Sequence, residues 1–137
     1  MTDITDHGPA PFVTNIEQAT LSNNNYRSTL WTGKHLQVTL MTIQPGHHIG
    51  LEVHETTDQF LRIEEGTATV YMGTSKDTLS PQQATQSDAV LVPAGTWHDL
   101  VNTGDAPLKI YSIYAPPQHP HGTVQATKQE ADAAEQD

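Results

Sequence analysis

The chain has 137 residues, with 6 Lys and Arg against 16 Asp and Glu, and a formal net charge of −10. This length allows one domain with one core, and the acidic balance excludes nucleic acid as a partner, because its phosphates would be repelled. There is no cysteine, so disulfides and thiolate metal sites are excluded, and any metal must bind through nitrogen and oxygen.

The sequence predicts neither a membrane span nor an export signal. No run approaches the roughly 20 apolar residues that a transmembrane helix needs. The N-terminal segment MTDITDHGPAPF is acidic and lacks the apolar stretch of a signal peptide. We therefore expect a cytoplasmic protein whose partner is a small-molecule substrate.

We expect one barrel domain, residues 12–122, between two loose ends. Residues 1–11 carry Gly8, Pro9 and Pro11 and show no periodicity, which predicts a flexible segment. Residues 123–137 are polar and rich in Ala and Glu, which predicts a polar tail or a short helix.

The middle of the chain predicts short β-strands separated by turns. Each run is rich in β-branched or large apolar residues, and turn signals such as Pro45-Gly46 and Gly104-Asp105 separate the runs. The pattern is typical of an all-β sandwich or barrel. In chain order, the predicted strands span residues 35–44, 49–54, 59–63, 67–72, 89–92, 98–102 and 108–114.

The last predicted strand, 108–114, is apolar on both faces. In so small a protein this indicates a covered edge or a homodimer interface, and two well-packed faces in a monomer are the alternative. A homodimer is therefore expected.

Four side chains suggest a metal site. Glu52 and His54 are two residues apart on a predicted strand, so they share a face. Gln59 follows at a distance that allows the chain to return on a neighbouring strand, and His98 lies on a separate strand. Two imidazoles, a carboxylate and an amide oxygen suit Zn²⁺, Mn²⁺, Fe²⁺, Co²⁺ or Ni²⁺. The alternative is that these are ordinary core or surface residues.

The segment PGHHIGLEVHETTDQFLRIEEG resembles the first motif of the cupin superfamily, G(X)5HXH(X)3-4E(X)6G. Gly46 and Gly66 match its glycines, and His54 matches its second histidine. Glu52 stands where the first histidine is usual, and Gln59 stands at the position of the glutamate. The acidic ligand has thus moved, but the net ligand charge is unchanged.

The segment PAGTWHDLVN is similar to the second cupin motif, PXG(X)2H(X)3N, with Pro93, Gly95, His98 and Asn102 in place. The resemblance implies a jelly-roll β-barrel (a double-stranded β-helix). It also implies that one divalent metal ion is held by Glu52, His54, Gln59 and His98.

Other segments are similar to small single-domain cupins described as mannose-6-phosphate isomerase-like: LWTGKHLQVTL, IGLEVH, QFLRIEEG, PAGTWH and YSIYAPP. This likeness implies a metal-dependent enzyme on a small polar substrate, with a sugar or sugar-phosphate isomerase as the specific expectation. Two histidines and one carboxylate also resemble a non-haem Fe(II) oxygenase site. A non-catalytic module that binds a small molecule is the third alternative.

Further polar residues are candidates for the chemistry. His48, beside the ligand strand, is the candidate proton carrier, with an exposed turn as the alternative. Lys34, Gln37 and Arg62 are candidates for holding an anionic or hydroxylated substrate, although Arg62 is out of phase with Gln59. His119, in the segment PPQHPHG, is interpreted as part of a proline-rich exit loop without function.

Overall fold

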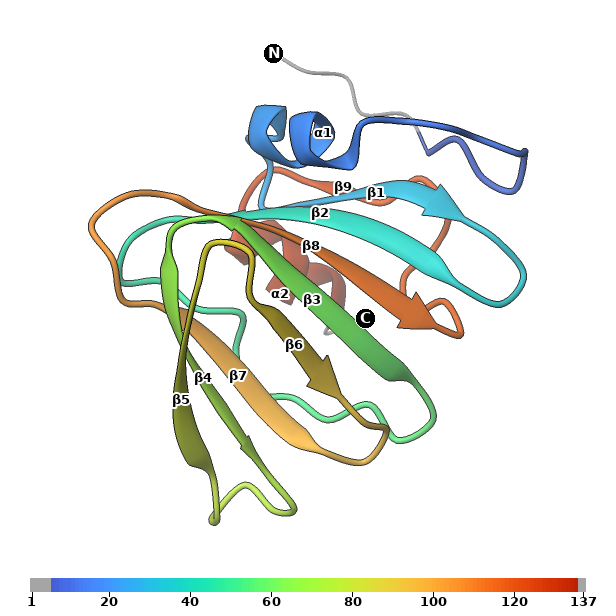
Figure 1. The fold of residues 1–137 in the computed structure, drawn as a ribbon. Coiled ribbons are helices and arrows are strands. Elements are labelled where there is room, and N and C mark those ends of the chain that lie inside the picture. The colour runs from blue at the N-terminus through green and yellow to red at the C-terminus, as the bar shows by residue number, and fades with distance from the viewer. Residues whose placement is uncertain (1–5, 136–137) are drawn as a thin grey trace.

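Two antiparallel β-sheets face each other in the computed structural model, which describes residues 6–135 (Figure 1). The larger sheet has the strand order β6-β3-β8-β2-β1-β9 and the smaller has the order β5-β4-β7. The all-β jelly-roll prediction is confirmed. The elements are α1 (Ile16–Ser22), β1 (Arg27–Thr32), β2 (Gln37–Ile43), β3 (Asp58–Glu65), β4 (Thr67–Gly73), β5 (Ser80–Thr85), β6 (Ala89–Val92), β7 (Trp97–Asn102), β8 (Leu108–Ala115), β9 (Val124–Gln125) and α2 (Lys128–Glu135).

The main core lies between the two sheets. Alternate residues of each strand point inward, so Leu61 and Ile110 from the larger sheet meet Val70 and Leu100 from the smaller one. All four are nearly inaccessible to solvent. Burial of these side chains against each other stabilises the barrel and leaves its polar inner positions enclosed.

Helix α1 covers the outer face of the larger sheet. Ile16 and Ala19 pack on Leu40, Tyr111 and neighbouring residues of that face. Strand β8 is therefore a central strand between β3 and β2, covered by the barrel core on one side and by α1 on the other. This arrangement accounts for the two apolar faces of β8 within one chain, whereas the homodimer stays a prediction.

Helix α1 was not predicted from the sequence. Its N-cap is Asn15, whose side-chain oxygen accepts a hydrogen bond from the amide of Gln18 at 3.0 Å. With only seven residues, the helix gives too short an apolar pattern to stand out. The short strands β1, β5 and β9 were likewise not predicted.

The prediction of a strand at residues 49–54 is wrong in part. In the structure this segment makes one isolated bridge, at Glu52 with His98, and His48 just before it makes another with Val101. Gly50 lies between them with a φ of 105°, a conformation that a regular strand does not contain. The segment therefore crosses the edge of the smaller sheet as an irregular ligand loop.

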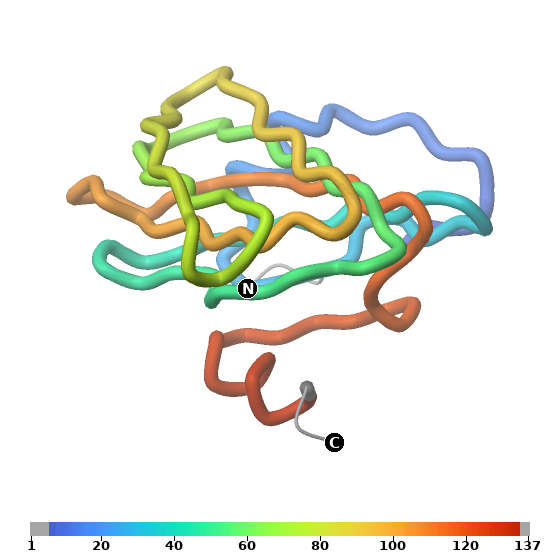
Figure 2. The backbone as a smooth tube through the Cα atoms, turned by 90° about the horizontal axis from the view of Figure 1, so that it is seen from below, coloured from blue at the N-terminus to red at the C-terminus, as the bar shows by residue number. Residues whose placement is uncertain are grey.

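Both ends of the described chain contact the barrel, and the division at residues 11 and 122 stays a prediction. The carboxylate of Asp6 accepts hydrogen bonds from Gly8, Thr32 and Gly122. The short C-terminal helix is confirmed as α2, and its Ala131 is buried in the main core. Figure 2 shows this C-terminal segment, in red, along one side of the barrel. Neither helix in the described residues is long and apolar enough to cross a membrane.

Candidate metal centre

Glu52 and His98 come together through a pair of backbone hydrogen bonds. The amide of Glu52 donates to the carbonyl of His98 at 3.0 Å, and the amide of His98 donates to the carbonyl of Glu52 at 2.9 Å. Residues paired in this way project their side chains to the same face. The tight turn at Gly95, with a φ of 83°, positions β7 for this pairing.

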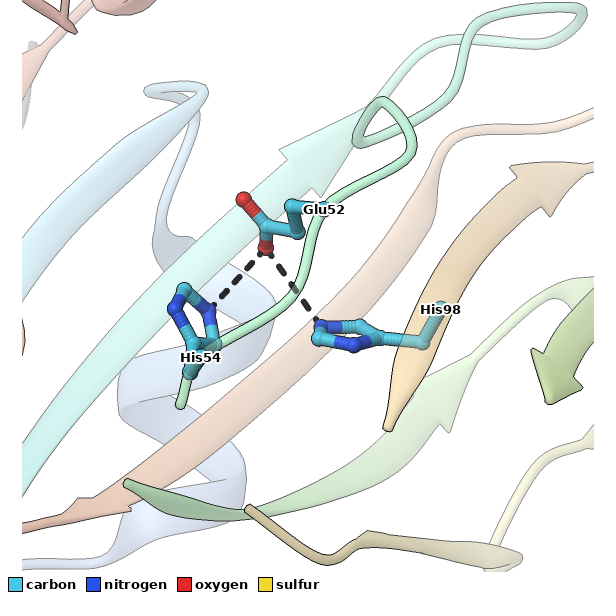
Figure 3. Close-up of side chains that lie close together, drawn as sticks. All are labelled: Glu52, His54 and His98. Carbon is cyan, nitrogen blue, oxygen red and sulfur yellow. Dashed lines mark ion pairs between the residues drawn. The ribbon is translucent and has the colours of Figure 1, made fainter. Parts of the chain in front are cut away.

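One oxygen of Glu52 faces two imidazoles (Figure 3). Glu52 Oε1 lies 3.3 Å from His54 Nε2 and 3.5 Å from His98 Nε2. The three potential ligand atoms all lie within 4.8 Å of one another. Around an ion with bonds of about 2.1 Å, neighbouring ligand atoms are about 3.0–3.5 Å apart, so the two distances from Glu52 to the imidazoles fit a shared ion.

The ring nitrogens that face Glu52 are buried without hydrogen-bond partners. His54 Nε2 and His98 Nε2 lie close to the carboxylate, but neither satisfies hydrogen-bond geometry. His98 Nδ1 lies 3.0 Å from the carbonyl of Thr96, which can only accept, so Nδ1 carries the proton. In the neutral ring, Nε2 of His98 therefore presents a lone pair to the cluster, as a metal ligand must.

The electrostatics of the cluster favour an ionised carboxylate. Burial alone would raise the pKa of Glu52, but the facing imidazoles of His54 and His98 outweigh it and lower the pKa to about 2. Burial would lower the pKa of His98, but Glu52 and the carbonyl of Thr96 outweigh burial and raise it. Each group therefore stabilises the charged form of the other when no metal is present.

Gln59, the fourth predicted ligand, lies on the inner face of β3. It is 3% exposed and is the register partner of Tyr114, whose ring lies 5.9 Å from that of His54. Its amide nitrogen donates to Ser112 at 3.5 Å, whereas its Oε1 is buried without a partner. A free oxygen on this face is the atom that a metal ligand would use. Metal ligation by Gln59 and by the other three residues stays a prediction.

The remaining predicted residues lie elsewhere. His48 pairs with Asp99, at 2.9 Å between Nδ1 and Oδ2, and its side chain is 48% exposed. Lys34 is exposed, and Arg62 is 3.8 Å from Glu64 with its side chain 40% exposed. Gln37 is buried, but its amide is used by the backbone of the exit loop. None of these four joins the cluster.

Three inner residues were missed by the sequence reasoning. Tyr114 lies against His54, and His119 packs edge-on against Tyr114 with ring centres 5.2 Å apart. Arg27 is 3% exposed at the start of β1. A lone arginine opening an otherwise uncharged strand was a signal for Arg27, whereas nothing local distinguishes His119 from an ordinary loop residue. The structure places His119 in the predicted exit loop after β8, with the atom Nε2 of its ring buried.

A cleft of about 390 Å³ leads to the cluster. It lies between the ligand loop and α2, and both Glu52 and His54 line it. Gln118, Lys128 and Asp132 line its other walls. This volume is in the range of small-molecule sites.

Comparison with known proteins identifies the family of the chain. Residues 39–114 match the protein family described as "Cupin domain". The uncharacterized protein YrkC of Bacillus subtilis (strain 168) is 60% identical over 131 residues, which cover 95% of this chain and 70% of YrkC. The uncharacterized protein L612 of Acanthamoeba polyphaga mimivirus is 40% identical over 114 residues, covering 82% of this chain and 70% of L612.

The crystal structure of BH2720 from Bacillus halodurans is similar over 95% of this chain and 99% of that chain, with a TM-score of 0.94 and 60% sequence identity. A fold shared at this level, together with both cupin motifs on adjoining strands, confirms the superfamily that the sequence motifs predicted. The protein therefore belongs to the cupin domain family.

Proposed function

We propose that this protein is a metal-dependent enzyme that acts on a small polar substrate at the barrel interior. The observation that carries the proposal is the convergence of Glu52, His54 and His98 on one point, with their facing ring nitrogens buried and without hydrogen-bond partners. Buried polar atoms without partners are costly, and a cation shared by all three would satisfy them.

The ligand set proposed is Glu52, His54, Gln59 and His98, and it suits Zn²⁺, Mn²⁺, Fe²⁺, Co²⁺ or Ni²⁺. Such an ion, when bound, supplies a Lewis acid that polarises a carbonyl or hydroxyl oxygen. The burial of His98 and Gln59, each 3% exposed, keeps bulk water away from these ligands. Exclusion of water strengthens every electrostatic interaction at the centre.

For the reaction we propose the isomerisation of a sugar or sugar phosphate. Such a reaction moves a proton between adjacent carbons and needs a group with a pKa near the operating pH to carry that proton. Burial, followed by the charge of Arg27, lowers the pKa of His119 to about 3, so its imidazole is neutral near pH 7. Burial raises the pKa of Tyr114, which keeps its hydroxyl protonated. Because these shifts move both pKa values away from neutral, His119 and Tyr114 are proposed as neutral hydrogen-bonding partners of the substrate, and His48 stays the proposed proton carrier.

The test compares Glu52→Gln with Glu55→Gln, because Glu55 is a neighbouring exposed carboxylate outside the cluster. Each protein is loaded with Zn²⁺ or Mn²⁺, its metal content is measured, and mannose 6-phosphate and related aldoses are supplied. We expect metal binding and aldose–ketose conversion in the wild type and in Glu55→Gln, and loss of both in Glu52→Gln. Wild-type conversion no faster than that of Glu52→Gln would end the isomerase proposal.

A second candidate is a non-haem Fe(II) oxygenase, favoured by the composition of the cluster, two imidazoles and one carboxylate. Oxygen uptake by the iron-loaded protein, absent from the zinc-loaded protein, would support it. Anaerobic turnover of a sugar would contradict it. If the metal-bound protein catalyses neither reaction, the third alternative, a non-catalytic cupin that binds a small molecule, would be supported.

We also propose a homodimer in solution. An apolar cleft of about 310 Å³ on the outer surface, lined in part by Phe60, Leu91 and Ile113, supports it. Leu91 is 67% exposed although it is apolar. Light scattering should give twice the chain mass for the wild type and the single mass for Leu91→Asp.

A further inference from the structure

Arg27 is a buried cation on the inner face of the barrel. It pairs in register with Met41, which belongs to the main core, so both side chains lie on the inner face of the larger sheet. The residue is 3% exposed. A guanidinium is rarely buried to this extent unless an anion neutralises it.

No such anion is supplied by the part of the chain that the structure describes. Within residues 6–134, whose side chains the structure describes, no carboxylate oxygen lies within 4.0 Å of the Arg27 side-chain nitrogens. Nη1 donates to the neutral side chain of Gln125 at 2.9 Å, and the guanidinium carbon lies 5.2 Å from the ring centre of Tyr26. Nε is buried without a hydrogen-bond partner. The charge of Arg27 and one of its donors therefore remain unsatisfied.

His119 presents a second unsatisfied atom on the same side of the barrel. Its Nε2 is buried without a partner, and its ring packs against Tyr114, which also contacts His54. Strand β2 pairs with β1 on one side and with β8 on the other, so Arg27 and Tyr114 belong to one continuous sheet. The positive charge of Arg27 is also among the causes that shift the pKa of His119 and of Tyr114. Unpartnered polar atoms that belong to different elements, the Nε–H of Arg27 on β1 and Nε2 of His119 on the exit loop, indicate a ligand that binds between them.

We propose that Arg27 and His119 form an oxyanion subsite beside the metal centre, which binds the carboxylate or phosphate group of a small substrate. The inference deepens the proposed metal-dependent function and rests on it for the identity of the site as a substrate site. Arg27 supplies the charge and the Nε–H donor, and His119 supplies a second donor in the neutral tautomer that carries its proton on Nε2. A charge-assisted hydrogen bond to a buried guanidinium is among the strongest single contacts available to an oxyanion.

The charge of the interior agrees with this assignment. A divalent ion with Glu52 as its one anionic ligand keeps a net positive charge, and Arg27 adds to it. A neutral substrate would leave that charge buried and uncompensated, whereas an anionic substrate would neutralise part of it. The cleft that reaches Glu52 and His54 is also lined by Gln118, which directly precedes His119. One small molecule bound in this cleft could therefore contact both the metal ligands and the exit loop.

The experiment measures anion binding by metal-free protein, so that an anion on the metal cannot be mistaken for one on Arg27. Acetate and inorganic phosphate are titrated separately by calorimetry, with ionic strength held constant by chloride. The variants are Arg27→Met, Arg27→Lys and His119→Gln. Arg62→Met is the matched control, because Arg62 is the other arginine and lies on the outer side of β3 with its side chain 40% exposed.

We expect saturable binding of acetate or phosphate to the wild type and to Arg62→Met. Arg27→Met should weaken it about tenfold or more, and Arg27→Lys and His119→Gln should weaken it by smaller factors. The anion that binds more tightly identifies the substrate group. If Arg27→Met fails to fold, Arg27→Lys and His119→Gln decide the result. Absence of saturable binding to the wild type, or equal affinity in the wild type and the folded Arg27 and His119 variants, would overturn the subsite.

Metal binding by the same preparations separates this inference from the proposed function. Anion binding that depends on Arg27, in a protein that binds none of zinc, manganese, iron, cobalt and nickel, would uphold the subsite and refute the metal-dependent function. Metal binding without anion binding would refute the subsite and leave the metal centre standing. Unchanged zinc affinity in Arg27→Met is expected, because Arg27 is outside the ligand cluster.

Discussion

The side-chain amide of Gln37 holds the backbone of His119 from both sides. Gln37 Nε2 donates to the carbonyl of His119 at 2.7 Å, and the amide of His119 donates to Gln37 Oε1 at 2.9 Å. The amide of Gln118 donates to the same oxygen at 3.1 Å. A residue in β2 thus fixes the exit loop 82 positions later, and with it the ring that lies against Tyr114.

Substitution of Gln37 should therefore destabilise the protein and release the loop. Gln37→Leu keeps the approximate volume but leaves the buried amides and carbonyl of the loop without partners. We expect the free energy of unfolding to fall by about 2–4 kcal/mol and hydrogen exchange at residues 118 and 119 to accelerate. Gln86→Leu, at an exposed position, is the control and should change stability by less than about 0.5 kcal/mol. Equal stability of the two variants would contradict the role assigned to Gln37.

The stability of the metal-free protein should peak in mildly acidic solution. The pKa of Glu52 is lowered from 4.5 to about 2, so its contribution is complete above pH 4.5 and is lost as the pH falls toward 2. The pKa of His98 is raised above 6.5, so its contribution is complete below pH 6.5 and is lost as the pH rises through the folded-state pKa. Both contributions are present together between about pH 4.5 and 6.5.

Urea unfolding of wild type and Glu52→Gln across this range measures the effect. The difference in the free energy of unfolding between them should shrink by about 3 kcal/mol from pH 5 to pH 2. It should also shrink on the alkaline side, because the raised pKa of His98 depends on Glu52. A difference that does not vary with pH would show that the carboxylate and the imidazole do not interact.

Gln59 is the proposed ligand with the fewest contacts to the cluster, and its removal tests the fourth position. Gln59→Leu removes the unpartnered Oε1 while keeping a similar volume on the inner face of β3. We expect zinc affinity to fall about tenfold or more, with little change in zinc-free stability, because Gln59 makes one long hydrogen bond, to Ser112. Gln82→Leu, at an exposed position in β5, is the matched control. Unchanged zinc affinity in Gln59→Leu would restrict the ligand set to Glu52, His54 and His98.

The carboxylate of Asp6 should hold the N-terminal segment on the barrel with a strength that depends on pH. Burial alone would raise its pKa, but hydrogen bonds from Thr32, Gly8 and Gly122 outweigh burial and lower it. Asp6→Asn turns an amide group toward these donors and should cost about 1–3 kcal/mol near pH 7.

Because the folded-state pKa lies below the unfolded one, the cost of Asp6→Asn should be complete above about pH 4 and disappear as the pH falls further. Thermal unfolding at pH 7 and at pH 3 measures it. Asp105→Asn, at an exposed position, serves as the control. A cost that persists unchanged at pH 3 would show that the charge of Asp6 is not what holds the segment.

The strand predictions are correct where the local apolar pattern and the residues at the turns agree. Residues 89–92, closed by Pro93 and Gly95, form β6 with the predicted bounds. The alternation at 49–54 was misleading, because Gly50 allows a backbone that leaves the strand between two bridges. The side chains of Glu52 and His54 still meet, since the backbone pairing of Glu52 with His98, rather than strand regularity, places them.

The sequence by itself determined the all-β architecture, the family motifs, and the residue types of the Glu52–His54–His98 cluster. These depend on short-range patterns: alternation of apolar residues, glycine and proline at turns, and ligand spacing within one loop. Only the tertiary structure decided that Arg27 is buried without a carboxylate partner in the described chain and that Nε2 of His119 is buried, with the ring beside Tyr114. Their burial depends on contacts between residues about a hundred positions apart, such as Arg27 with Gln125 at a separation of 98, and no local pattern encodes such contacts.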